Sequence, residues 1–185
     1  MQMDERILAE ECREGDGAAR RELYDRFAGR LMAVCMRYAG DRATAEDLLH
    51  DAFLKIYGAF GKFSYRGPGS LRAWMERVMV NVALEHLRRN DVLSQSAALD
   101  DMPLEAYDEP EPDACDTIPV QVLMRFIGEL PAGYRTVFNL YVMEGKSHKE
   151  IAALLGINEK SSASQLARAK AALAEKVKGW MKTNG

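Results

Sequence analysis

A single acidic segment divides this chain. Residues 91–119, DVLSQSAALDDMPLEAYDEPEPDACDTIP, contain nine Asp or Glu residues and neither Lys nor Arg. Four of the six prolines of the chain also lie in this segment. Like charges that repel each other, and prolines that cannot donate a backbone hydrogen bond, keep such a stretch from forming a packed element. We therefore predict a linker over residues 91–118, with a separate domain on each side.

Both flanking segments show helical periodicity. Apolar residues recur at three- and four-residue spacing, Ala, Leu, Met, Glu and Arg dominate, and alternating strand-like runs are absent. The pattern predicts an all-α fold, in which two small helical domains, residues 1–90 and residues 119–185, are joined by the acidic linker. The expected helices lie near residues 3–14, 17–38, 43–60, 69–90, 119–129, 132–144, 148–155 and 159–179.

Composition excludes several classes of protein. With 48% apolar and 29% charged residues, the 185-residue chain can bury a core. Its apolar runs fall short of the ~18 residues that a membrane span needs, and its charged start is unlike a secretory signal. Three scattered cysteines and three separated histidines form no disulfide or zinc pattern, and no nucleophile or phosphate-loop motif is present. We expect a cytoplasmic protein without a metal or cofactor, and an enzyme is the least favoured class.

Residues 147–170, SHKEIAALLGINEKSSASQLARAK, show the pattern of a helix-turn-helix. Ser147 and Glu150 fit a capping box at the start of a short helix. Gly156 allows the positive φ of a tight turn, and Asn158 is suited to cap the longer helix that follows. One face of that longer helix offers small polar and bidentate groups for base edges, and cations for phosphates. This predicted reading face consists of Lys160, Ser161, Ser164, Gln165 and Arg168.

The alternative for this segment is a plain pair of helices with a solvated polar face, which the agreement of caps, turn and face chemistry disfavours. The reading face is weakly charged, because its cations are Lys160 and Arg168 and Glu159 lies nearby. Neutralising phosphates supplies most of the non-specific affinity for DNA. This domain alone is therefore expected to bind duplex DNA weakly.

The helix expected around AEDLLHDAFLKIYGAF, residues 45–60, has an apolar side for the core and an opposite side that carries Asp47, Asp51 and Leu54. An exposed leucine framed by two carboxylates suits docking onto a basic helical partner. The alternative is an ordinary solvated face with one stray leucine, which is normal on protein surfaces. Taken by itself, this row of residues favours the alternative.

A second candidate surface follows in GKFSYRGPGSLRAWMERVMVNVALEHLRRN, residues 61–90. A loop that contains Gly and Pro mixes cations with aromatic residues, and the next helix carries a polar row beside Trp74. Aromatic rings interleaved with cations can stack on unpaired bases and hold them. Trp74 is equally consistent with a core anchor. The candidate DNA-binding residues are Lys62, Phe63, Tyr65, Arg66, Trp74, Arg77, Asn81 and Arg88.

Taken in order, these segments resemble the extracytoplasmic-function (group 4) sigma factors of bacterial RNA polymerase, in the sigma-70 family. The resemblance extends over nearly the whole chain. It rests on LYDRF (23–27), AEDLLHDAFLKIY (45–57), WMERVMVNVALEHLRR (74–89) and LPAGYRTVFNLYVMEGKSHKEIAALLGI (130–157). It implies a first domain that binds the β′ clamp helices of core RNA polymerase and opens the −10 element. It also implies a second domain that reads the −35 element and touches the β flap.

The resemblance gives each candidate set a role. Asp47, Asp51 and Leu54 would face the clamp. The loop at 62–70 would hold a flipped −10 base, with Asn81 and Arg77 near the non-template strand. The predicted reading face would enter the −35 major groove. Three positions depart from the family pattern: Ala163 and Gln165 stand where many members have Lys and Arg, and Ser162 replaces a common apolar residue that faces the core.

The function that the resemblance implies is that of a non-enzymatic initiation factor that recruits core polymerase to specific promoter DNA. It also implies an inhibitory anti-sigma partner, often anchored in the membrane. Two rival hypotheses stay open. An autonomous helix-turn-helix regulator would bind duplex DNA by itself, as a dimer on paired half-sites. A protein-only adaptor would keep its function when Lys160 and Arg168 are replaced.

Overall fold

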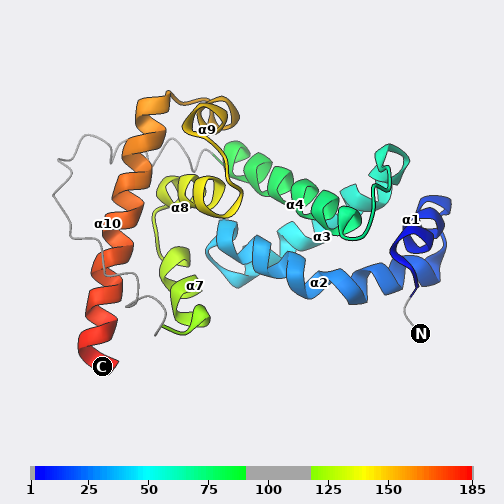
Figure 1. The fold of residues 1–185 in the computed structure, drawn as a ribbon, viewed down its shortest axis with the longest axis horizontal. Coiled ribbons are helices and arrows are strands. Elements are labelled where there is room, and N and C mark those ends of the chain that lie inside the picture. The colour runs from blue at the N-terminus through cyan, green and yellow to red at the C-terminus, as the bar shows by residue number, and fades with distance from the viewer. Residues whose placement is uncertain (1–2, 91–117, 185) are drawn as a thin grey trace. The chain divides into compact units, whose positions relative to one another are not determined.

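The computed structural model describes residues 3–90 and 118–184. The chain forms two compact units, residues 1–86 and 87–185. In the described ranges all regular secondary structure is helical, which confirms the predicted all-α class (Figure 1). The predicted linker lies outside the described residues except for its last residue, Ile118.

The helices of the first unit begin and end close to the expected positions. They are α1 (Glu5–Glu14), α2 (Gly17–Ala39), α3 (Arg42–Ala59), the 3-10 turn η1 (Phe60–Lys62) and α4 (Ser70–Arg89), whose last residues, from Leu87, belong to the second unit. The side chains of Asp4, Asp16 and Asp41 accept backbone N–H groups at the starts of α1, α2 and α3. Gly15 ends α1 in the left-handed conformation, with a φ of 90°.

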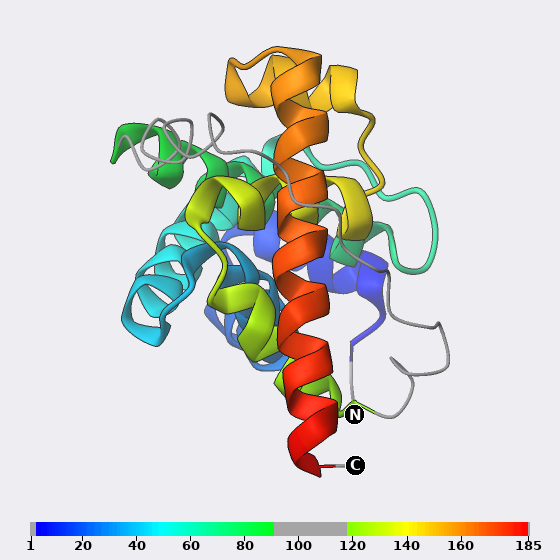
Figure 2. The ribbon, with the colours of Figure 1, turned by 90° about the vertical axis from the view of Figure 1, so that its left-hand side faces the viewer.

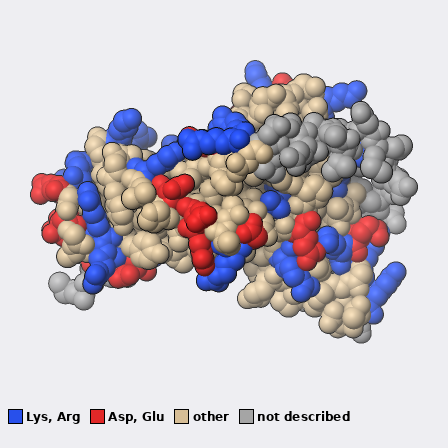
Figure 3. Space-filling model, turned by 180° about the vertical axis from the view of Figure 1, so that it is seen from behind, with Lys and Arg blue, Asp and Glu red and all other residues tan. Residues whose placement is uncertain are grey.

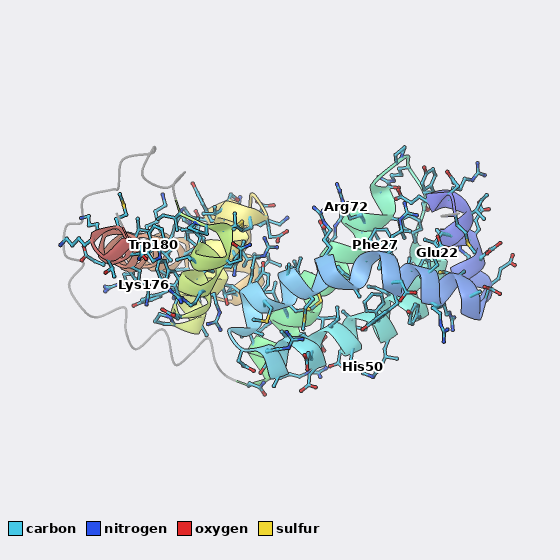
Figure 4. The ribbon with its side chains drawn as sticks, turned by 90° about the horizontal axis from the view of Figure 1, so that it is seen from below. Glu22, Phe27, His50, Arg72, Lys176 and Trp180 are labelled. Carbon is cyan, nitrogen blue, oxygen red and sulfur yellow. The ribbon has the colours of Figure 1, made fainter. Side chains whose placement is uncertain are left out.

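Helices α2, α3 and α4 share one apolar core. The predicted core side of α3 is buried, and Ile56 is fully enclosed. Between α2 and α4, the Cys35 thiol lies 3.0 Å from Sδ of Met79, and both residues are 0% exposed. Arg30 of α2 pairs with Glu76 of α4 at 2.6 Å at the edge of this core. Helix α1 packs against α2, on which Glu22 accepts a hydrogen bond from the Met3 amide at 2.8 Å (Figure 4).

The second unit is built around one long helix. Its elements are α7 (Val120–Gly128), α8 (Ala132–Phe138), the π-helical turn η2 (Asn139–Met143), α9 (His148–Leu155) and α10 (Glu159–Asn184). Figure 2 shows α10 running the length of this unit, with α7 and α8 along its side and α9 beside its first turns. The sequence expects one helix over 132–144. The structure instead changes to the wider π turn at the fully buried Asn139.

Two apolar clusters hold α10 in place. One contains the buried residues Leu130, Tyr134 and Ala169, and the other contains Ile118, Phe126 and Val177. Trp180 packs against the second cluster, so α10 continues beyond its expected end at residue 179. Lys176 and Trp180 lie on the side of α10 that faces α7 (Figure 4). Ile118, which the sequence analysis assigned to the linker, therefore belongs to the core of the second unit.

Candidate nucleic-acid and partner interfaces

The outer face of α3 presents the three residues that the sequence singled out. Asp47 and Asp51 are exposed, and 57% of the surface of Leu54 is accessible. Their spacing of four and three residues aligns them along one face of the helix, opposite the buried core side. Asp47, Asp51 and Leu54 thus form one continuous exposed surface, which we call the α3 face.

An aromatic cluster that the sequence analysis missed borders this face. Tyr24 of α2, which is 45% exposed, packs on Phe53 at a centroid distance of 4.7 Å. Phe53 in turn contacts the ring of Tyr57 at 5.8 Å. The half-buried Tyr57 thus provides apolar surface beside Leu54 on the same helix. Tyr24 could not be placed there from spacing within α3, because it comes from another helix.

The loop between η1 and α4 differs from its prediction in one important residue. Phe63 is only 5% exposed, and its ring packs on Phe60 at 6.4 Å and on Trp74 at 5.0 Å. Trp74 also contacts Phe60 at 5.3 Å and is half-buried. Phe63 is therefore a core residue and not a free platform for a base, and the core-anchor alternative for Trp74 is supported. Packing removes the apolar ring of Phe63 from water, and this burial stabilises its contacts with Phe60 and Trp74.

The rest of the loop remains at the surface. Lys62 and Arg66 are exposed and Tyr65 is half-buried. The loop is closed at its end by Ser70, whose hydroxyl donates to the Gly67 carbonyl at 2.7 Å. Gly67 has a φ of 124°, a conformation that only glycine adopts without strain. The loop therefore has a defined shape that displays two cations.

A polar row on α4 runs alongside. Arg77, Asn81 and Arg88 are all exposed, as the helical pattern predicts. Beside this row lies a shallow pocket of about 340 Å³ between α3 and α4. Asn81 and Lys62 line it together with residues that the sequence analysis did not select. These are Lys55, Gly58, Ala59, Val78 and Val82.

The pocket has the chemistry of a site for a planar, polar group. Val78 and the small residues Gly58 and Ala59 give it apolar walls, while the Asn81 amide offers both donors and an acceptor. Val78 is half-buried and open to this pocket. Lys55 also forms an ion pair with Glu85 of α4. Such a combination can hold an unstacked base.

The helix-turn-helix of the second unit is formed as predicted. The Ser147 hydroxyl accepts the Glu150 amide, and the Glu150 carboxylate accepts the Ser147 amide at 2.8 Å. The hydrogen bonds that the Glu150 carboxylate accepts from the amide and the hydroxyl of Ser147 hold the pKa of Glu150 below its ordinary value. Gly156 makes the turn with a φ of 69°, and Asn158 caps α10 by accepting the Ser161 amide at 2.7 Å.

The residues of the predicted reading face on α10 differ in their exposure. Lys160 is exposed, and Ser161, Ser164 and Arg168 are half-buried. Gln165, however, is 3% exposed. It lies one helical turn from both Ser162 and Ala169, which are completely buried, so it belongs to the packed side of α10. Gln165 is thus wrong as a base-reading residue in this conformation.

Neither unit is uniformly cationic. Lys and Arg side chains are interspersed with Asp and Glu on the face that Figure 3 shows. The part of the chain that the structure describes has no group of three potential metal ligands and no helix able to cross a membrane. Burial raises the pKa of Cys12 to about 11 and that of Cys35 to about 12, so both are protonated, unreactive core thiols at neutral pH.

Comparison with protein families decides what this arrangement is. The family model for "Sigma-70 region 2" matches residues 23–92, and that for "Sigma-70, region 4" matches residues 121–173. Together they match well over half of the chain, in the order and spacing of the two units. The chain belongs to the sigma-70 family. It is a sigma factor of the extracytoplasmic-function type, a transcription initiation factor that directs RNA polymerase to promoters.

Relatives match this sigma factor over nearly their full length. The RNA polymerase sigma-H factor of Pseudomonas aeruginosa is 28% identical over 181 residues, which covers 93% of each chain. The ECF RNA polymerase sigma-E factor of Escherichia coli K12 is 27% identical over 187 residues and 95% of each chain. Among solved structures, CnrH in complex with the cytosolic domain of CnrY is 23% identical with a TM-score of 0.47, and covers 97% of this chain and 98% of its own.

Proposed function

We propose that this sigma factor binds core RNA polymerase through the α3 face. The observation that carries the proposal is Leu54, a large apolar side chain left 57% exposed beside two carboxylates, Asp47 and Asp51, on the face of α3 opposite its buried side. A basic helical partner, such as the β′ clamp helices, would cover the leucine and meet the charges of Asp47 and Asp51. The neighbouring Tyr24 and Tyr57 would extend the apolar contact.

The first unit would then open the −10 element. A base flipped from the duplex would enter the pocket between α3 and α4, where Asn81 can hydrogen-bond to its edge. Lys62, which lines the pocket, and the exposed Arg66 and Arg77 would supply positive charge for the displaced strand, and Arg88 would supply it further along α4. Flipping costs a few kcal/mol for each unstacked base, and binding in the pocket offsets that cost.

The second unit would read the −35 element with the start of α10. Lys160, Ser161, Ser164 and Arg168 form the proposed contact surface, from which Gln165 is now removed. So few cations give this surface weak affinity for duplex DNA on its own. Holding both units on one polymerase raises their effective concentration at a promoter, so selectivity arises only in the assembled enzyme.

The same proposal covers partners and location. The factor would supply no catalytic group and would act in the cytoplasm, on polymerase and promoter DNA. An anti-sigma protein that covers these surfaces remains a prediction from the family resemblance.

The test is run-off transcription with purified core polymerase and a pool of genomic promoters. We expect promoter-dependent transcripts that vanish without the factor, and strand opening, followed by permanganate reactivity of thymines, that falls at least about tenfold in Asn81→Ala. Arg42→Ala is the matched control, because Arg42 is exposed at the opposite end of α3 from the pocket. Absence of any promoter-dependent transcript would refute the proposed function.

A further inference from the structure

Helix α1 holds both ends of the loop that joins η1 to α4. At the start of the loop, Arg13 donates from Nη2 to the Phe63 carbonyl at 2.9 Å and from Nε to the Phe60 carbonyl at 3.3 Å. At its end, the two carboxylate oxygens of Glu5 accept the amides of Gly69 and Leu71, each at 2.7 Å. Residues more than forty positions apart in sequence thus meet at this loop.

These contacts satisfy backbone groups that helix geometry leaves open. The first N–H groups of α4 have no partner within the helix, and the Glu5 carboxylate accepts one of them from Leu71. A negative charge at a helix N-terminus also lies favourably in the helix dipole. Hydrogen bonds to an ionised partner are stronger than neutral ones, so two charged residues of α1 fix one backbone group at each end of the loop, Phe63 and Gly69, and one in each flanking helix, Phe60 and Leu71.

The segment between these fixed points carries proposed DNA contacts. Tyr65 and Arg66 lie between the Phe63 carbonyl held by Arg13 and the amides held by Glu5. Lys62 lies between the two carbonyls that Arg13 binds. Phe63 is anchored in the aromatic triad with Phe60 and Trp74. The positions of Lys62, which lines the pocket, and of the exposed Arg66 therefore depend on where α1 holds the backbone.

We propose that Glu5 and Arg13 are positioning residues for −10 recognition, which fix the loop in its reading shape before DNA arrives. A loop that is already ordered loses less conformational freedom on binding, which strengthens capture of the flipped base. This inference rests on the proposed function of the first unit. It assigns α1, which makes no proposed DNA contact, a role in promoter opening.

Substitutions of Glu5 and Arg13 can distinguish a positioning role in DNA binding from a direct effect of their charges on the DNA. Glu5→Gln removes a negative charge near a DNA-binding loop, and by counterion release alone this would strengthen DNA binding. Arg13→Lys keeps its charge but loses the planar fork that reaches two carbonyls. Positioning predicts that both variants bind the −10 strand more weakly. The matched controls are Glu10→Gln and Arg6→Lys, which alter an exposed ion pair on the same helix.

The experiment combines two measurements on the full chain. Hydrogen exchange of the free protein should show the amides of Gly69 and Leu71 exchanging at least about tenfold faster in Glu5→Gln, with the amides of α9 unchanged. Affinity of the holoenzyme for a single-stranded −10 oligonucleotide should fall about tenfold in Glu5→Gln and Arg13→Lys, but not in the controls. Affinity for core polymerase should be unchanged in all four variants.

Two results would overturn the inference. One is a Glu5→Gln variant whose loop amides exchange like those of the wild type. The other is faster exchange without any loss of oligonucleotide affinity, which would make the contacts structural only. If the wild-type holoenzyme does not prefer the −10 strand, the proposed function fails instead, and hydrogen exchange still decides whether α1 holds the loop.

Discussion

His148 of α9 and Ser162 of α10 lie 2.9 Å apart, from Nδ1 of the imidazole to Oγ of the hydroxyl. The ring of Tyr141 stacks on the same imidazole at a centroid distance of 4.8 Å. Ser162 is fully buried, at a position where the family resemblance led us to expect an apolar residue. The polar residue is accommodated because its hydroxyl has a partner on the facing helix. This pair therefore fixes the packing of the two helices of the helix-turn-helix.

Ser162→Ala should destabilise the second unit by about 1 kcal/mol, because it removes the partner of the His148 ring nitrogen. The chain has two tryptophans, Trp74 in the first unit and Trp180 in the second. In a Trp74→Phe background, urea unfolding followed by the fluorescence of Trp180 reports on the second unit alone. Ser161→Ala, one position earlier on the same turn and only half-buried, is the control. Equal stability of the two variants would argue against this role for Ser162.

Replacing each of two glycines of the second unit with alanine should change the stability of that unit in opposite directions. Gly156 has a φ of 69°, so Gly156→Ala should cost about 1 kcal/mol or more. Gly179 lies within α10, and a Cβ there would meet no atom within 4 Å, so Gly179→Ala should stabilise by roughly 0.5–1 kcal/mol. The same Trp180 fluorescence assay measures both. A stabilising Gly156→Ala would contradict the turn conformation described here.

The capping box makes α9 sensitive to acid. The folded-state pKa of Glu150 is lowered, mainly because its carboxylate accepts hydrogen bonds from Ser147, so the carboxylate form stabilises the folded state. That stabilisation is fully present above the ordinary value of 4.5, and it is lost as pH falls from there through the lowered folded value. In this pH range, the free energy of unfolding of the second unit should depend less on pH in Glu150→Gln than in the wild type. An unaltered slope in the variant would contradict the assignment.

The helix bounds could be read from the sequence because their signals are local. An aspartate, serine or asparagine cap and a glycine stop act within one turn, so the start of α9 after its cap Ser147 and its end before Gly156 follow from neighbouring residues. The division of faces was less certain. Gln165 was assigned to the outer face from its angle on a single helix, but α10 is enclosed over a wider arc than one partner would cover.

Contacts between distant segments could not be predicted. Glu5 lies more than sixty residues from the amides that it binds, and nothing in the spacing around Glu5 indicates α4. Phe63 looked like a DNA-stacking residue because it stands among cations, whereas its burial depends on Phe60 and Trp74 meeting in space. The sequence pattern gave no role to Glu5 and the wrong role to Phe63, because in both cases the partners come from other helices.

Leu54→Asp should weaken binding to core polymerase at least tenfold, since buried apolar anchors dominate such interfaces. Its effect on folding should be small, because the side chain is already 57% exposed. Ile7→Asp is the control, since Ile7 is 49% exposed on α1 and lies outside the α3 face. Fluorescence anisotropy of labelled variants titrated with core polymerase measures the affinity. Equal losses in the two variants would show that the α3 face has no special role.

The central claim is that two weakly binding units become selective only when polymerase holds them together. It is tested most directly by measuring the affinity of one promoter duplex, and of a scrambled duplex, for the free chain and for the chain with core enzyme at the same salt concentration. We predict that the assembled enzyme prefers the promoter at least about a hundredfold, whereas the free chain binds both duplexes weakly and alike. Tight, sequence-specific binding by the free chain, unchanged when polymerase is added, would contradict the account.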